Sequence, residues 1–207
     1  MTDADSTAAT QIVEAARSSF LRFGYSRVST EEIARSIGRS KKTLYKHFAS
    51  KESLLHAVLA LIDRETGREL AGLLAEAGGD RHARLRSILT TVAVRLASVH
   101  QVLLADLRAC SPELGLQAWR GRRRALASLL TPVLHEAVEE QVVRSDLTAD
   151  QVLEIFFSCV EGMVSPVEAG PGAQDPGKMF GALVCLMVDG LAGPRGGAPR
   201  TDPLKAS

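Results

Sequence analysis

The sequence has few aromatic residues, no long apolar run and no paired set of cysteines. Aromatic residues make up 4% of the 207 residues, and the longest apolar run, Ala182 to Val188, is far shorter than the roughly 18 residues that suggest a membrane span. Three widely spaced cysteines, Cys110, Cys159 and Cys185, cannot complete a disulfide framework. The polar, acidic first ten residues predict no secretory signal. We therefore expect no membrane partner, and a reducing cytoplasm is the predicted compartment.

Motifs of catalysis and metal binding are also missing. The chain has no Gly-rich phosphate loop, no His-Glu-x-x-His, no Gly-x-Ser-x-Gly and no metal-spaced His/Cys group. His100, Asp106 and Cys110 are the only nearby set with nucleophile and base chemistry, and offsets of six and ten residues do not place them on one helix face. We expect neither an enzyme nor a cofactor.

The charge is balanced overall but not locally. The formal net charge is +1, yet the segment Gln11 to Lys51 holds nine basic residues against three acidic ones. The remainder of the chain after Lys51 is slightly acidic. A local basic excess suits a polyanion such as nucleic acid, although a solvated basic face is the alternative interpretation.

Apolar periodicity predicts an all-α chain of about nine helices, with no β-alternating segment. Capping boxes at Ser29 and Thr148 and an N-cap at Ser40 mark three helix starts. Pro132 is expected to kink or interrupt the seventh helix. The first predicted helix ends at Gly24. The others lie at 30–37, 41–48, 52–77, 82–99, 102–108 and 178–191, with two more that begin at 112 and 149.

Two of the short helices form a helix-turn-helix pattern. They are joined by a turn containing Gly38, and the second carries Lys41, Lys42 and Lys46. In such a motif the second helix enters the major groove of DNA while the first holds its angle. Two packed helices of an ordinary bundle remain the alternative at this point. The expected core residues of the motif are Ile33, Ile37, Leu44 and Phe48.

The first quarter of the chain closely resembles the TetR/AcrR family of bacterial transcriptional regulators. The resemblance is carried by the run from Ile12 to Phe20, Phe23-Gly24-Tyr25, Ser29-Thr30, Ile33-Ala34, Gly38-Arg39-Ser40, Thr43-Leu44-Tyr45-Lys46-His47-Phe48 and Ser50-Lys51-Glu52. It implies a DNA-binding domain at 1–51 and a ligand-binding and dimerisation domain at 52–193. The residues 194–207 are predicted to form a disordered tail.

The resemblance also implies which residues contact DNA. Lys41 and Lys42 match positions that face base edges, where a lysine reads guanine or clamps a phosphate. Tyr45 matches a tyrosine that packs on the DNA backbone or a thymine methyl, with a core role as the alternative. Arg39 replaces the usual small apolar residue of the turn, and it either reaches DNA or extends into solvent. The full set of expected contacts is Thr30, Arg39, Lys41, Lys42, Thr43, Tyr45, His47 and Lys51.

For the second domain the resemblance implies a homodimer and a small-molecule effector that is largely apolar. A two-fold dimer requires a palindromic operator, and the effector would release the repressor from it. The dimer contacts are expected at Phe157, Val160, Phe180, Val184 and Met187, because the last two helices carry more apolar surface than they can bury internally. Candidate effector contacts are Arg95, His100, Asp106, Trp119, Phe156, Cys159 and Met163, each with core packing or a surface ion pair as the alternative.

A different kind of regulator is the remaining alternative. It would act without a ligand or would respond to oxidation of a thiol. The three cysteines lie in sequences that predict apolar helical surroundings, where thiols are usually inert. A redox sensor is therefore the second choice.

Overall fold

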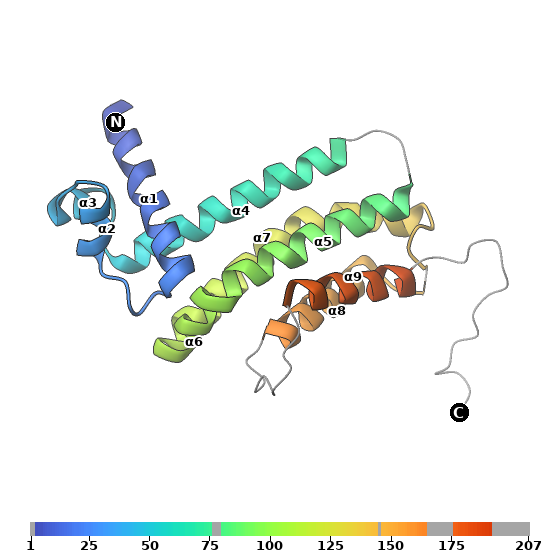
Figure 1. Cartoon of the computed structure of the whole chain (residues 1–207). Coiled ribbons are helices and arrows are strands. Elements are labelled where there is room, and N and C mark those ends of the chain that lie inside the picture. The colour runs from blue at the N-terminus through green and yellow to red at the C-terminus, as the bar shows by residue number, and fades with distance from the viewer. Residues whose placement is uncertain (1–2, 76–79, 145, 165–175, 192–207) are drawn as a thin grey trace.

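The computed structural model describes residues 3–75, 80–144, 146–164 and 176–191, and within these ranges the chain contains nine α-helices and no strand (Figure 1). This confirms the predicted all-α class. The predicted tail at 194–207 lies outside the described residues. The helices are α1 (Asp3–Phe23), α2 (Thr30–Ser36), α3 (Lys41–His47), α4 (Lys51–Ala75), α5 (Arg81–Val99), α6 (Ala105–Cys110), α7 (Pro112–Glu139), α8 (Ala149–Val164) and α9 (Pro176–Leu191), with a π-helical turn, η1 (His100–Leu104), between α5 and α6.

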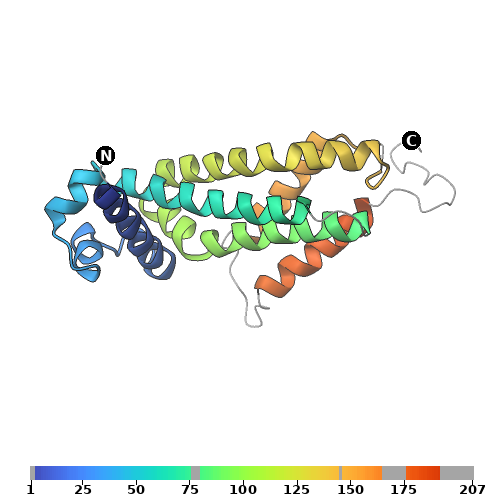
Figure 2. The ribbon, with the colours of Figure 1, turned by 90° about the horizontal axis from the view of Figure 1, so that it is seen from above.

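The helices form an elongated molecule with α1, α2 and α3 gathered at one end (Figure 1). Helix α4 begins in this group and runs along the molecule, where it lies beside α5 and α7 (Figure 2). Helix α8 packs on α7, and α9 packs along α5. The helix α4 therefore physically joins the three-helix end to the long bundle.

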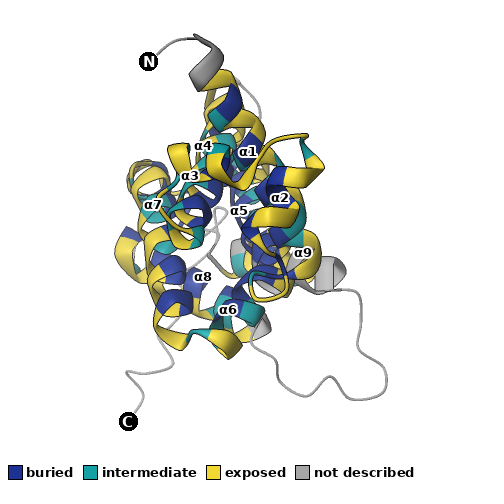
Figure 3. Cartoon of the chain, turned by 90° about the vertical axis from the view of Figure 1, so that its left-hand side faces the viewer, coloured by how far each residue is buried: buried dark blue, intermediate teal, exposed yellow. Residues whose placement is uncertain are grey.

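The apolar side chains form one continuous core. It extends from Ile12 in α1 to Val184 in α9. Seen end-on, buried residues lie mainly on the inner sides of the helices and exposed residues on their outer sides (Figure 3). In the helix-turn-helix, Ile33 and Leu44 are fully buried, whereas Ile37 and Phe48 are only partly buried. The three-helix end is thus held by the core that also fills the bundle.

The predicted helix starts are confirmed by their hydrogen bonds. The Ser29 hydroxyl accepts from the Glu32 amide, and the Glu32 carboxylate accepts from the Ser29 amide. Thr148 and Gln151 make the same reciprocal pair at the start of α8. These caps supply partners for amides that the first helical turn leaves free.

Of the kink or interruption expected at Pro132, the interruption is wrong, because α7 is one helix from Pro112 to Glu139 with Pro132 inside it, and a kink there stays a prediction. A proline removes one backbone hydrogen bond, and buried neighbours such as Leu130, Val133 and Leu134 hold the helix across that position. Helix η1 was not predicted as such; the sequence indicated only a break between Val99 and Val102.

Among the described residues, no single helix has the length and apolar character to cross a membrane. Two consecutive helical segments, Arg81–Val99 and Val102–Cys110, are together long and apolar enough, and the bend between them is 46°.

Candidate nucleic-acid interface

The turn between α2 and α3 is a tight one built on Gly38. Gly38 has a φ of +65°, a left-handed backbone conformation that costs steric energy in a residue with a Cβ. The amides of Gly38 and Arg39 donate to the carbonyls of Arg35 and Ala34, at 3.1 and 2.9 Å. Ser40 then caps α3 by accepting from the Thr43 amide at 3.1 Å. The turn fixes the angle at which α3 leaves the domain.

Helix α3 has one face in the core and the other in solvent. Leu44 is fully buried, while Lys41, Lys42, Tyr45 and Lys46 are exposed. The seven residues of α3 include no acid, so the outward face is entirely cationic or neutral. This is the arrangement that a helix needs to enter a major groove and to neutralise phosphates beside it.

Tyr45 and Thr30 form a pair across the motif. Tyr45 is 42% exposed, so it does not fill the core, and its hydroxyl lies 3.2 Å from the Thr30 hydroxyl. Thr30 itself is buried at the first turn of α2. The pair orients the tyrosine ring on the outer surface, next to the lysines of α3.

Lys51 is engaged within the protein. Its ammonium donates to the Tyr25 carbonyl at 2.5 Å and lies 4.2 Å from the centre of the Tyr25 ring. Burial lowers the pKa of Lys51 from its ordinary value. These contacts hold the loop between α1 and α2. The predicted phosphate contact by Lys51 stays a prediction, and it would use the same ammonium group that contacts Tyr25.

The other expected DNA contacts lie on the same end of the molecule. Arg39 is exposed beside α1, with a long contact of 3.4 Å from its Nη2 to the Gln11 side chain. Thr43 and His47 are half-buried, and the Thr43 hydroxyl is 2.9 Å from that of Ser40. Lys46 was not included among the predicted contacts, although its position four residues after Lys42 places it on the same helix face.

Helix α6 of the bundle holds the loop that precedes α2. The Asp106 carboxylate accepts from the Ser26 amide and the Ser26 hydroxyl, both at 2.6 Å. Burial opposes ionisation of Asp106, but these hydrogen bonds outweigh it and its pKa lies below the ordinary value. The contact therefore contributes stability above the unfolded pKa of about 3.9 and is lost only as pH falls through the folded value. Asp106 was expected to contact an effector, and the structure instead joins it to the DNA-binding end.

Gly24 sits under this contact, so substituting it tests the contact. Its φ is +86°, and an added Cβ would lie 2.9 Å from the Asp106 Cγ. Gly38 also has a positive φ, but an added Cβ there meets nothing within 4 Å. In urea unfolding we expect Gly38→Ala to cost about 1 kcal/mol and Gly24→Ala to cost at least about 1 kcal/mol more. Equal losses in the two variants would contradict a close packing of α6 on the loop.

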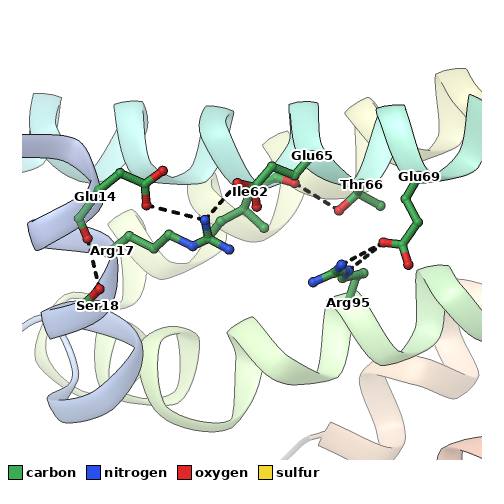
Figure 4. A network of polar contacts seen from close by, with 8 residues as sticks. All are labelled: Glu14, Arg17, Ser18, Ile62, Glu65, Thr66, Glu69 and Arg95. Atoms are coloured by element: carbon green, nitrogen blue, oxygen red, sulfur yellow. Dashed lines mark hydrogen bonds and ion pairs between the residues drawn. The ribbon is translucent and has the colours of Figure 1, made fainter. Parts of the chain in front are cut away.

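Ion pairs hold α4 between its neighbours (Figure 4). Arg17 of α1 lies 2.8 Å from Glu65, and Arg95 of α5 lies 2.7 Å from Glu69. Arg95 was another candidate effector contact, and the structure gives it the alternative role of a surface ion pair. The first pair links α4 to α1, and the second links α4 to α5.

The candidate effector residues are distributed over α5, η1, α6, α7 and α8. Trp119 and Phe156 are buried in the core, and Cys159 is half-buried on α8. The side chains of His100 and Met163 lie outside the described residues. Within the described ranges, no group of three His, Cys, Asp or Glu side chains is placed to hold a metal ion.

Most of the candidate dimer residues are buried in the core of the single chain. Phe157, Val160 and Val184 are fully buried, and Met187 packs partly against the core, while the side chain of Phe180 lies outside the described residues. Phe157, Val160 and Val184 are therefore buried by this chain alone and are not the excess apolar surface that was expected. Helix α9 packs along α5, so α5 covers the apolar face of α9, and the sequence alone does not show this contact.

The cysteine surroundings also differ from the prediction. Cys110 and Cys185 are exposed, and Cys159 is half-buried. Helical periodicity placed all three in apolar sequence, but Cys110 falls at the exposed end of a six-residue helix, α6. Cys110 and Cys185 are therefore exposed to solvent, and burial does not make them inert.

Together, the turn, the cap and the outward cationic face of α3 define a helix-turn-helix DNA-binding protein. A family model described as bacterial regulatory proteins of the tetR family matches residues 12–58. The chain is 30% identical over 151 residues to the uncharacterized HTH-type transcriptional regulator Rv1255c of Mycobacterium tuberculosis, over 73% of each chain. It is 25% identical over 180 residues to the HTH-type transcriptional repressor Rv1474c of the same organism, over 84% of this chain and 87% of the relative.

A solved structure shows the same fold over most of the chain. The transcriptional regulator FadR from Bacillus subtilis, in complex with stearoyl-CoA, superposes with a TM-score of 0.65 at 19% identity, over 87% of this chain and 98% of that one. The chain belongs to the TetR family of bacterial transcriptional regulators. This family membership confirms the resemblance seen in the sequence. It also confirms the prediction of a DNA-binding regulator, since the family is not one of enzymes.

Proposed function

We propose that this regulator is a homodimeric repressor that binds a palindromic operator and leaves it when a small molecule binds. The outward face of α3, with Lys41, Lys42 and Tyr45 exposed over a buried Leu44, carries the DNA half of the proposal. The similarity to a relative named as a repressor supports the sign of the regulation. A cytoplasmic location follows from the same role.

On DNA, two copies of α3 would enter successive major grooves. Two-fold symmetry then places the half-sites about 34 Å apart and makes the operator an inverted repeat. Lys41 and Lys42 begin α3, where side chains reach base edges, and both are candidates for guanine contacts. Tyr45, held by Thr30, packs on the sugar-phosphate backbone or a thymine methyl, and the remaining predicted residues contact phosphates.

The dimer would form on the outward faces of α8 and α9. On α9 the exposed stripe is Ala182, Cys185, Leu186 and Asp189, and Leu186 is 73% exposed. On α8 Ile155 is 43% exposed, and Ser158 and Gly162 continue that stripe. Small residues around one large apolar side chain allow helices to approach closely and bury it.

Two helices connect the bundle to the DNA-binding end and can transmit the effector signal. Helix α4 continues from the helix-turn-helix at Lys51, and α6 holds the Ser26 loop through Asp106. An effector that binds better when α4 or α6 is displaced weakens DNA binding, and DNA weakens the effector by the same coupling free energy. The similarity to a regulator solved with stearoyl-CoA supports an effector with a large apolar part.

Selection from random duplex DNA tests this function. We expect the enriched sequences to contain an inverted repeat with half-sites about one helical turn apart, bound by two chains in analytical ultracentrifugation. Enriched sites without two-fold symmetry, bound by one chain, would contradict the dimer. Loss of operator binding with peroxide, restored by a thiol reductant, would favour the thiol-responsive alternative through Cys110 or Cys185.

A further inference from the structure

Arg122 is the only charged residue among the described residues that is classed as buried. It lies in the middle of α7, and its residue surface is 1% exposed. Its Nη1 lies 2.8 Å from Oδ1 of Asp63 on α4, which is itself largely buried. Charged side chains are seldom fully buried unless they are paired, so the quality of this pair decides its meaning.

The pair leaves most of the guanidinium unused. No protein group in the described ranges makes a well-formed hydrogen bond with Nε, Nη1 or Nη2 of Arg122, or with Oδ1 of Asp63. A guanidinium carries five N–H donors and stays protonated, so one nearby carboxylate oxygen satisfies it poorly. Burial raises the pKa of Asp63, and the Arg122 charge opposes this only in part. A pair kept for stability would be better replaced by apolar side chains.

Buried side chains flank the pair on both helices. Trp119 and Leu126, one helical turn to either side of Arg122 on α7, are both buried. On α4, Thr66 is buried one turn from Asp63, and its hydroxyl donates to the Ile62 carbonyl at 2.9 Å (Figure 4). Small-molecule sites typically combine such apolar walls with a few polar groups that fix the orientation of the ligand.

We propose that Arg122 binds the carboxylate of an apolar effector and that Asp63 is the group this carboxylate replaces. A carboxylate accepts two parallel N–H bonds from a guanidinium and so uses the donors that Asp63 leaves unused. The proposal rests on the proposed function, because it assigns the chemical class of the effector. It also gives the effector a direct hold on α4: Asp63, deprived of its cation, has to move or take a proton, and α4 begins beside α3.

Calorimetry without DNA tests this assignment with pairs of probes that differ only in charge. The probes are decanoate with decanamide and 4-phenylbutyrate with 4-phenylbutyramide, together with decyl phosphate. For at least one pair we expect the wild-type chain to bind the carboxylate about tenfold or more tighter than the amide. Asp63→Asn should strengthen carboxylate binding, because it removes the competing anion.

Two variants locate the discrimination. Arg122→Gln should bring each carboxylate and its amide to within about threefold of each other. Arg123→Gln is the matched control, since the neighbouring Arg123 pairs with Glu154 on the surface, and it should discriminate as the wild type does. If Arg122→Gln does not fold, the double variant Asp63→Leu/Arg122→Met leaves no buried charge, should fold, and should also lose the discrimination.

Several results would overturn the assignment. They are a wild-type chain that binds neither pair or binds both members equally, an Arg122 variant that still discriminates, and binding of decyl phosphate alone. Intact operator binding with any of these results would leave the proposed function standing. Discrimination by Arg122 in a chain that recognises no inverted repeat would instead refute the proposed function and keep the carboxylate site.

Discussion

Replacing both Lys41 and Lys42 by alanine is expected to lower operator affinity by about 1,000-fold or more at fixed salt, because a base contact contributes roughly 1–3 kcal/mol and a dimer loses four candidate contacts. The salt dependence of binding should also become shallower if either lysine neutralises a phosphate. The fold should be unaffected, since both side chains are exposed on α3. Fluorescence anisotropy over a salt series, with the melting temperature as the folding check, measures both effects.

The control is a pair of arginines on another part of the surface. Arg64 and Arg68 are exposed on α4, so Arg64→Ala/Arg68→Ala removes the same net charge away from α3. We expect it to change operator affinity by less than about threefold, as distant surface charges are screened. Equal losses in the two double variants would show that total charge, and not the helix α3, determines binding.

Leu186→Glu is expected to separate the dimer. The side chain is 73% exposed on α9, and a carboxylate buried there in each of two symmetric copies would cost several kcal/mol. At micromolar concentration the variant should sediment as a folded monomer and lose most of its operator affinity, because one α3 then binds a single half-site. Sedimentation velocity and anisotropy on the same samples measure the two losses together.

Leu116→Glu provides the matched substitution. Leu116 is an exposed leucine on α7 and is not part of the proposed interface on α8 and α9. This variant should remain dimeric and bind the operator normally. If Leu186→Glu stays dimeric as well, the two protomers meet on a different surface.

Local signals predicted three helix starts and the exposed face of α3 well. Ser29, Ser40 and Thr148 each cap a helix through a bond between residues three apart, so their short sequence spacing is enough to identify them. The outward direction of Lys41 and Lys42 follows in the same way from the buried Leu44 on a helix of fixed period.

Contacts between distant segments could not be predicted in this way. Asp106 looked like a free polar anchor because its partner, Ser26, is 80 residues away, and Val184 looked like interface because its cover comes from α5. In the sequence, Arg122 stands beside Arg120, Arg123 and Arg124, and nothing local separates it from these neighbours. Only the packing of α4 on α7 shows that it is buried beside Asp63.

Backbone amide resonances of Lys41 to His47, followed during titration with the selected operator, test the central claim most directly. If α3 enters the major groove, these amides shift and their exchange with solvent slows, while exposed amides at the far end of α7 keep their positions. The same titration with a duplex of scrambled sequence should give smaller, salt-sensitive shifts. Operator binding that leaves the α3 amides unchanged would contradict the assignment of α3 as the recognition helix.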